Sequence, residues 1–339
     1  MNGPSRASLK MGDSMRTATL LAAALLATTV NIGSLANAQA PAGPAPAVPR
    51  ESLSNIQTGI YPSRYVGDAS KSVTRIARDT IMTRAVLTAG NPMAAGANGA
   101  VLRYRNEVVV GTMMPGEATA LAAMPEQQLI YVEGGNGRID DGVRSWPLHE
   151  GLVLLLPANV ANRFTVTGDA PLTMLMMTEP AHTDAKAAKS ILVRDLSKIL
   201  YVEQGAHWTN LSKAPFTDVG ERFLIVYMGP RSIAGPHAHT PETEEGWVKL
   251  TDGETWLEIG SEIMPWTKNM GMIAPPNGQS VHAAINTSDT RQAFFYFATT
   301  RAPGTPPPPP DPNRTQPNPI FEQSAVRSTV APTLLKGGR

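Results

Sequence analysis

Short apolar runs separated by turn residues recur along most of this chain. The runs are rich in Val, Ile, Leu, Tyr and Phe, and Gly, Pro or Asn-Gly pairs stand between them, which is typical of antiparallel strands joined by tight turns. The pattern predicts an all-β chain with two series of strands, at 101–104, 107–110, 129–133, 152–155, 164–166 and 172–177, and then at 223–227, 247–250, 255–259, 270–273, 281–285 and 293–298.

The segment 183–200 lies between the two series and departs from this pattern. Its Ala-Lys and Leu-Lys spacing has a helical period. We therefore expect a short helical connector between the two sets of strands.

The two series align as copies of each other. The segment GTMMPGEATALAAMPEQQLIYVEGG aligns with VYMGPRSIAGPHAHTPETEEGWVKLTDG, and LVLLLPANVANRFTV aligns with GMIAPPNGQSVHAAIN. This alignment matches Glu126 with Glu244 and Asn162 with His282, and the separation within each pair of motifs is 36 residues in the first copy and 38 in the second. The sequence therefore indicates a tandem duplication.

Candidate metal ligands concentrate in the second copy. Three of the six histidines in the chain, His237, His239 and His282, lie within 235–286. Because His237 and His239 are two residues apart, both rings project from the same face of an extended strand. His282 follows on a returning strand, and Glu244 adds a carboxylate. Three imidazoles and a carboxylate suit a divalent ion such as Mn, Fe, Ni, Cu or Zn.

The choice of carboxylate rests on strand alternation, because Glu242, Glu244 and Glu245 lie close together. Glu244 shares its face with Val248, which predicts a side chain that points inward. Glu245 shares its face with Trp247, which we expect on the outside together with Lys249. We therefore predict Glu244 as the ligand and keep Glu245 as the alternative.

The two motifs resemble those of a known family. The segment GPHAHTPETE, which ends at Glu244, and the segment PPNGQSVHAAIN, which ends at Asn286, are similar to the two signature motifs of the cupin superfamily. One extra residue between Gly278 and His282, and a longer spacing after Glu244, depart from the pattern at turns, where insertions are tolerated. The resemblance covers roughly 70–300 and implies a bicupin of two double-stranded β-helix (jelly-roll) barrels. It implies a metal site formed by His237, His239, Glu244 and His282.

The first copy lacks the ligand set. Thr119 and Leu121 take the places of the paired histidines in the alignment, and Asn162 takes the place of the last one. One isolated carboxylate cannot retain a transition metal. We expect a degenerate first barrel with a structural, dimer-forming or substrate-covering role. In the dimer-forming role, the first barrel would make the chain a homo-oligomer.

The two ends of the chain have a different composition from the middle. Met15-Arg16, an apolar run over 17–30 and small residues at 36–38 predict a signal peptide and a periplasmic or secreted protein. That run is shorter than the roughly 20 residues needed to cross a bilayer, so we expect no stable membrane anchor. The predicted organisation is 1–38 signal peptide, 39–69 Pro-rich spacer and arm, 70–180 degenerate barrel, 181–210 connector, 211–301 metal-binding barrel and 302–339 Pro-rich disordered tail.

Composition excludes several other classes. The 29 basic residues nearly balance the 28 acidic ones and are scattered along the chain, which argues against a nucleic-acid partner. The chain has no cysteine, so a hydrophobic core and not disulfides must stabilise an exported protein. Neither a nucleophile elbow nor a phosphate-binding loop is present, so hydrolase and nucleotide-binding functions lose support.

The predicted site leaves room on a metal for water, dioxygen or a bidentate substrate. Our leading hypothesis is an exported metal-dependent enzyme, an oxidoreductase of the dioxygenase kind, that acts on a small organic compound with Glu244 as general base. The alternatives are a non-catalytic protein that binds a metal or a small ligand and, less favoured, a decarboxylase, isomerase or lyase. In enzymes that resemble oxalate decarboxylase both barrels carry metal ligands, whereas here the first copy does not.

Overall fold

The computed structural model describes residues 61–182, 187–203, 210–219 and 223–301. Strands dominate these residues, and the helical turns among them are short 3-10 helices: η1 (Pro62–Tyr65), η2 (Ala69–Lys71), η3 (Leu196–Lys198) and η5 (Thr217–Val219). The predicted signal peptide and the Pro-rich tail lie outside the described residues. No helix in the described part of the chain has the length and apolar character needed to span a membrane.

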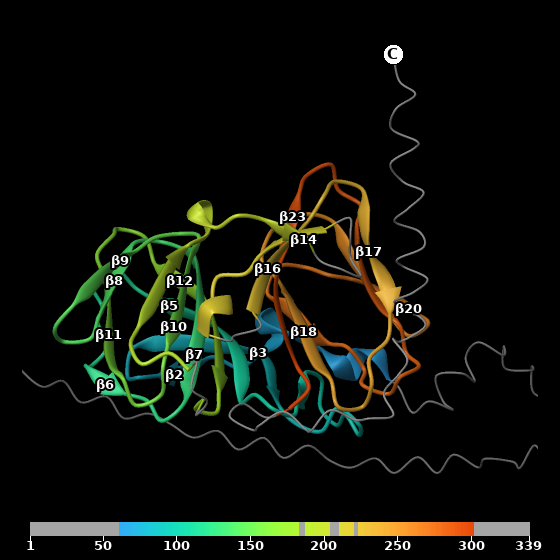
Figure 1. Cartoon of the computed structure of the whole chain (residues 1–339), viewed down its shortest axis with the longest axis horizontal. Coiled ribbons are helices and arrows are strands. Elements are labelled where there is room, and N and C mark those ends of the chain that lie inside the picture. The colour runs from blue at the N-terminus through green and yellow to red at the C-terminus, as the bar shows by residue number, and fades with distance from the viewer. Residues whose placement is uncertain (1–60, 183–186, 204–209, 220–222, 302–339) are drawn as a thin grey trace, which may run out of the picture. The chain divides into compact units, whose positions relative to one another are not determined.

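Two large sheets, antiparallel except for one pair of strands in the first, form the framework (Figure 1). The first has the order β13 (Leu192–Asp195), β10 (Leu152–Leu156), β7 (Gln127–Gly134), β12 (Leu172–Glu179), β5 (Glu107–Met113), β3 (Ile81–Ala89) and β2 (Arg75–Ala77), and β4 (Ala100–Leu102) pairs with β3 in parallel. The second has the order β1 (Val66–Asp68), β21 (Met270–Ile273), β18 (Glu244–Lys249), β23 (Gln292–Thr299), β16 (Phe223–Met228), β15 (Asn210–Lys213) and β14 (Val202–Glu203).

Each large sheet is accompanied by a small sheet of four strands. The small sheet of the first barrel has the order β6 (Ala122–Ala123), β11 (Ala161–Val166), β8 (Gly137–Asp140) and β9 (Ser145–Leu148). The small sheet of the second barrel has the order β17 (Ser232–His237), β22 (His282–Asn286), β19 (Thr255–Ile259) and β20 (Glu262–Pro265). The strand orders match position by position between the two halves, as expected of a duplicated chain. The predicted all-β fold of two tandem jelly-roll barrels is confirmed.

Strands at the edges tie the two halves together. Strand β1, which precedes the first series, pairs with β21 of the second sheet, with Val66 opposite Met272. Strand β13, which precedes the second series, pairs with β10 of the first sheet, with Leu152 opposite Asp195. In Figure 1 the blue start of the described chain accordingly lies among the orange strands of the second half. Each large sheet is therefore completed by a segment that leads into the other barrel.

The connector is only partly helical. Of the segment 183–200, in which we predicted a helix, residues 183–186 lie outside the described part, and the remainder contains strand β13 and the single 3-10 turn η3. The backbone of β13 satisfies its hydrogen bonds on the edge of β10, and Ile191 and Leu196 are buried beside it. This tertiary pairing overrides the local helical spacing of the sequence.

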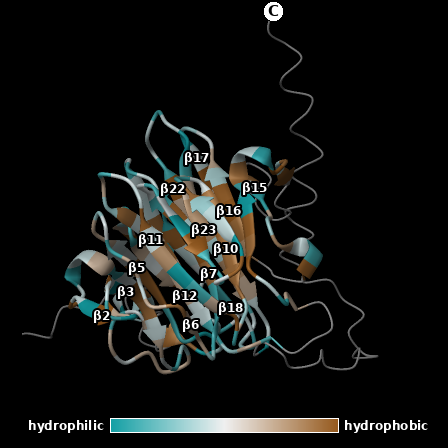
Figure 2. Cartoon of the chain, turned by 90° about the vertical axis from the view of Figure 1, so that its left-hand side faces the viewer, coloured by the Kyte–Doolittle hydropathy of each residue, from teal (hydrophilic) through white to brown (hydrophobic). Residues whose placement is uncertain are grey.

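Both faces of the large sheets are buried. On β7, Ile130 and Val132 pack in the core inside the first barrel, whereas Leu129 belongs to the core that continues into the second barrel. On β12, Met176 and Met177 divide in the same way between the two cores. Figure 2 colours much of the ribbon around β16 and β23 as hydrophobic. Alternate side chains along these strands therefore point to two different buried faces, and the alternation does not distinguish a buried face from a solvent-exposed one.

Candidate metal centre

Strand pairing brings the sequence-distant histidines together. His237 ends β17 and lies directly opposite His282, the first residue of β22. His239 lies in the turn that follows β17, and its carbonyl accepts a hydrogen bond from the Gly278 backbone N–H at 2.7 Å. The turn that precedes His282 is thus tied to the turn that carries His239.

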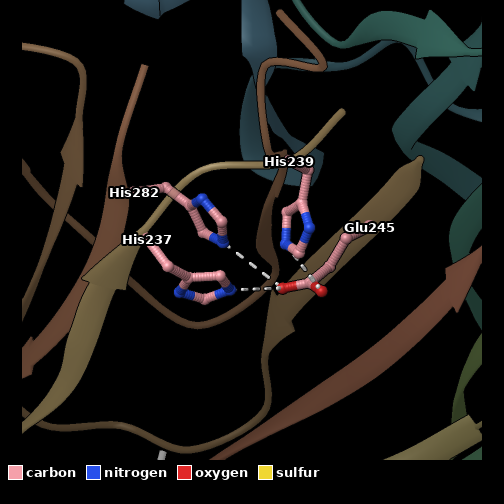
Figure 3. Close-up of side chains that lie close together, drawn as sticks. All are labelled: His237, His239, Glu245 and His282. Carbon is pink, nitrogen blue, oxygen red and sulfur yellow. Dashed lines mark hydrogen bonds and ion pairs between the residues drawn. The ribbon is translucent and has the colours of Figure 1, made fainter. Parts of the chain in front are cut away.

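Three histidine side chains converge on one carboxylate, that of Glu245 on β18 (Figure 3). The Nε2 atom of His239 lies 3.0 Å from Glu245 Oε2, and the Nε2 atoms of His282 and His237 lie 3.3 and 3.9 Å from Oε1. One ligand atom from each of the four residues lies within 4.8 Å of the others. His282 is fully buried and His239 is the most exposed of the four, at 16%. In the described part of the chain, this is the one group of three or more His, Asp or Glu side chains arranged to hold a metal ion.

The prediction that Glu244 joins this group is wrong. The Glu244 side chain points to the opposite face of β18 and forms an ion pair with Arg105 of the first barrel, at 2.8 Å. The physical reason is that Trp247, which we expected on the outside, is fully buried within the second barrel, where its ring lies 5.0 Å from the ring of His282. Glu245 shares the face of Trp247, so it points to the histidines. His237, His239 and His282 all lie where the sequence prediction needs them.

One histidine has a hydrogen bond that fixes its tautomer. His237 Nδ1 lies 3.1 Å from the carbonyl oxygen of Gly235. Because a carbonyl can only accept, Nδ1 carries the proton, and Nε2 presents its lone pair to the cluster. This is the arrangement by which backbone carbonyls orient metal-binding histidines. The donor set therefore fits a divalent transition metal.

The protonation states also suit metal binding. Burial raises the pKa of Glu245, but hydrogen bonds and charge from His239 and His282 lower it more, so the net pKa lies well below the usual range. Burial lowers the pKa of His282, against the opposing effect of Glu245. An ionised carboxylate and a neutral imidazole are the forms that bind a metal ion.

Two further side chains hold the carboxylate. The indole Nε1–H of Trp247 donates to Glu245 Oε1, and the hydroxyl of Tyr296 donates to Oε2, each at 2.9 Å. Tyr296 lies on β23 directly opposite Trp247. The sequence prediction missed both residues in this role. The shared parity of Glu245 and Trp247 carried a signal, whereas the distant Tyr296 left none in the local sequence.

The first barrel differs at the aligned positions. The hydroxyl of Thr119 accepts a hydrogen bond from the Phe164 backbone N–H at 3.1 Å, and Leu121 is exposed. Asn162 is buried and its Oδ1 accepts a hydrogen bond from Arg78 Nη1 at 2.5 Å. None of these side chains offers an imidazole or a carboxylate to a metal ion.

Comparisons with known proteins address the fold. No family model matches the sequence, and no curated protein matches it. Protein Ylba from E. coli has a solved structure that is similar to this chain, with 12% identity and a TM-score of 0.53, over 74% of this chain and 98% of that one.

Two oxalate decarboxylases are also similar. The enzyme from Lactobacillus farciminis, in its formate complex, is 14% identical with a TM-score of 0.51, over 72% of this chain and 88% of that one. The enzyme from Bacillus subtilis, in a structure concerned with its Mn(II) centres, is 13% identical with a TM-score of 0.51, over 71% of this chain and 78% of that one. At these identities the likeness shows the fold alone, and it agrees with the predicted pair of tandem jelly-roll barrels.

Proposed function

We propose that the second barrel binds a divalent transition metal through His237, His239, Glu245 and His282, and that the protein is a metal-dependent enzyme acting on a small organic compound. The observation that carries the proposal is the convergence of three imidazole Nε2 atoms on one buried carboxylate. Mn, Fe, Ni, Cu and Zn all accept this donor set, and selectivity among them depends on geometry and availability.

The side chains around the metal centre would orient its ligands and exclude water. A bound ion would act as a Lewis acid or bind dioxygen at positions that the four ligands leave open. Trp247 and Tyr296 hold both oxygens of Glu245, which favours a fixed ligand over a mobile general base. We therefore assign Glu245 a ligand role, and the proposed base role of Glu244 is withdrawn because its carboxylate points to the first barrel.

The reaction class that we propose is an oxidation of the dioxygenase kind. A single metal centre supports it over the decarboxylase alternative, since the first barrel presents no matching ligand set among the described residues. The likeness to oxalate decarboxylases is a likeness of fold, and a shared fold does not identify the substrate. The non-catalytic alternative predicts a bound metal without turnover.

Metal analysis and turnover test the proposal together. The purified protein should contain about one transition-metal ion per chain, and the variants His237→Ala and His282→Ala should lose it while His149→Ala, a change at an exposed histidine of the first barrel, keeps it. Oxygen consumption would then be measured with catechols, flavonols and small keto or dicarboxylic acids. Full metal content in both site variants would refute the site, and metal without turnover of any substrate class would favour the binding function.

Export is a separate proposal that rests on the sequence of residues 1–38. Expression of the full chain in a bacterial host should give a periplasmic or secreted protein whose amino terminus lies near Gln39. Mass spectrometry of the purified protein measures this directly. An intact chain in the cytoplasm would contradict it.

A further inference from the structure

A buried carboxylate of the second barrel is bound almost entirely by the first barrel. Glu244 is 1% exposed. Its Oε2 accepts hydrogen bonds from the backbone N–H groups of Arg103 and Tyr104, at 2.5 and 2.8 Å, and its Oε1 accepts one from Arg105 Nη1 at 2.8 Å. Three donors from one short segment therefore satisfy a charge that would otherwise be costly to bury.

The guanidinium that binds Glu244 is itself fixed within the first barrel. Arg105 Nε lies 3.2 Å from Glu179 Oε2, and Gln127 donates to Glu179 Oε1 at 2.8 Å. The guanidinium also lies over the ring of Phe297, 4.7 Å from its centroid. Gly246 makes room for that ring, because a Cβ atom there would meet it at 2.1 Å. Arg105 is thus held by Glu179 of the first barrel and packs against Phe297 of the second.

The same segment contacts the turn that carries His239. Arg103 Nη1 donates to the carbonyl of Pro241 at 2.8 Å, and Pro241 lies between His239 and Glu244 in the chain. Glu244 and Glu245 are neighbours on one strand, so their side chains leave opposite faces. Fixing Glu244 on one face therefore sets the position at which Glu245 emerges on the other.

We propose that Arg105, together with the backbone of residues 103–105, is a positioning element for the metal centre of the second barrel. This inference rests on the proposed metal binding by Glu245 and the three histidines. The first barrel, which lacks the ligand set, thereby contributes to the site through the ion pair of Arg105 with Glu244. The ion pair acts through the backbone of β18 and touches neither metal nor substrate.

A second contact between the barrels provides a matched control. Lys268, between β20 and β21, lies 3.6 Å from Glu133 Oε2 on β7, and the Glu133 side chain is 4% exposed. This pair also joins the two barrels through a buried carboxylate. Neither Lys268 nor Glu133 belongs to the group of metal-ligating residues, and neither donates a hydrogen bond to Glu244 in the contacts described above. Its loss should weaken the interface without moving Glu245.

The test measures cobalt(II) binding to the full chain of the wild type, Glu244→Gln, Arg105→Lys and Lys268→Met. Cobalt(II) reports both affinity and ligand geometry through its visible absorption spectrum. Glu244→Gln and Arg105→Lys should bind cobalt about 10- to 100-fold more weakly, the range found for outer partners of metal ligands, and should show an altered spectrum. Lys268→Met should keep wild-type affinity and spectrum, whatever its melting temperature.

The outcomes separate the two proposals. Folded Glu244→Gln and Arg105→Lys proteins with wild-type affinity and spectrum would show a purely structural ion pair and overturn the inference while leaving the metal site intact. If Glu244→Gln does not fold, Arg105→Lys, which retains the positive charge, decides by the same two measurements. A wild-type protein that binds no cobalt would overturn the proposed function, and the inference with it.

Discussion

The two barrels share one topology and differ in what occupies the same place inside them. In the second, His282 on β22 is fully buried beside His237 and Glu245. In the first, the aligned residue Asn162 on β11 is also buried, but its side-chain and backbone oxygens accept hydrogen bonds from Arg78, each at 2.5 Å. A guanidinium cation thus lies beside Asn162, whereas the second barrel has the three imidazoles and the carboxylate of the proposed metal centre at this place.

This difference separates the residues that determine the fold from those that form the proposed metal centre. Apolar alternation and turns are retained in both halves, and the matching strand orders follow from them. The ligand set depends on four inward polar side chains and can be lost without loss of the barrel. The Arg78 guanidinium also packs over the ring of Phe164, 5.5 Å from its centroid, so the first barrel has filled its interior with its own side chains.

The largest expected difference between the two barrels is the stabilisation of the folded protein by metal binding to the second barrel. Metal binding to the native state should raise the free energy of unfolding by about 3 kcal/mol when the free metal is about 100 times Kd. We expect this increase in the wild type and its complete loss in His282→Ala. Thermal melts with and without Zn²⁺ or Mn²⁺ would measure it.

Asn162→Ala is the matched change in the first barrel. It should lower stability but leave the metal-dependent increase unchanged. An equal loss of that increase in Asn162→Ala would contradict the assignment of the metal to the second barrel.

The next effect concerns the arginine of the first barrel. Arg78→Met removes the hydrogen bonds to both oxygens of Asn162 and leaves them unsatisfied in a largely buried place. We expect a loss of about 1–3 kcal/mol in the free energy of unfolding, with no change in metal affinity. Denaturant titration and cobalt binding on the same samples would check both. A variant that acquires a second bound metal ion would show that Arg78 had been excluding one.

The sequence predicted the architecture because strand periodicity and turns are local properties. It also identified all three histidines, since the two-residue spacing of His237 and His239 is visible in the local sequence, although His239 lies just beyond the end of β17. It could not choose the carboxylate by parity, because both faces of β18 are buried: Trp247 lies inside the second barrel, and Glu244 faces the first. Apolar character alone does not say which buried face holds the metal.

Long-range contacts account for the remaining differences. Arg105 and Glu244 are separated by 139 residues, and nothing local in the segment 103–105 marks it as a partner of the second barrel. Strand β13 likewise owes its extended conformation to the edge of β10, which lies about forty residues earlier in the chain. Features that depend on how the two copies pack against each other therefore could not be predicted from the periodicity of the sequence.

A smaller effect is expected at the hydroxyl of Tyr296. Tyr296→Phe removes the hydrogen bond to Glu245 Oε2 and keeps the ring. Metal affinity should fall about tenfold, at the low end of the range for outer partners of ligands, while the free energy of unfolding falls by only about 1 kcal/mol. Competition with a chromophoric chelator measures the affinity.

Tyr227→Phe on β16 is the control for this change. The Tyr227 ring contacts Tyr201, 5.5 Å away by centroids, and it is absent from the metal-ligating group. Its metal affinity should equal that of the wild type. Equal affinities in Tyr296→Phe and the wild type would mean that Trp247 and the histidines orient Glu245 without the tyrosine.

The smallest expected effect comes from a difference between the buried side chains of two equivalent strands, β7 and β18. Strand β7 places Val132 inside the first barrel, whereas β18 carries the fully buried Lys249, whose Nζ donates to Gln292 Oε1 and to the Thr251 carbonyl at 2.5 Å each. Burial lowers the pKa of Lys249 to about 8 from its ordinary value of 10.5. The folded state therefore binds this proton less readily than the unfolded state does.

The sign of the pH dependence follows from that difference. Between pH 8 and 10.5 the unfolded chain binds more protons at this site, so stability should rise with pH across this window, and below pH 8 the full cost of the buried charge remains. After allowance for solvent screening we expect a rise of about 1 kcal/mol. Urea titrations of the metal-free wild type and Lys249→Met at pH 7.5 and 9.5 isolate it, because other groups titrate equally in both proteins. If the two proteins showed the same change between these pH values, Lys249 would be neutral or compensated in the folded barrel, and the contrast with Val132 would carry no energetic consequence.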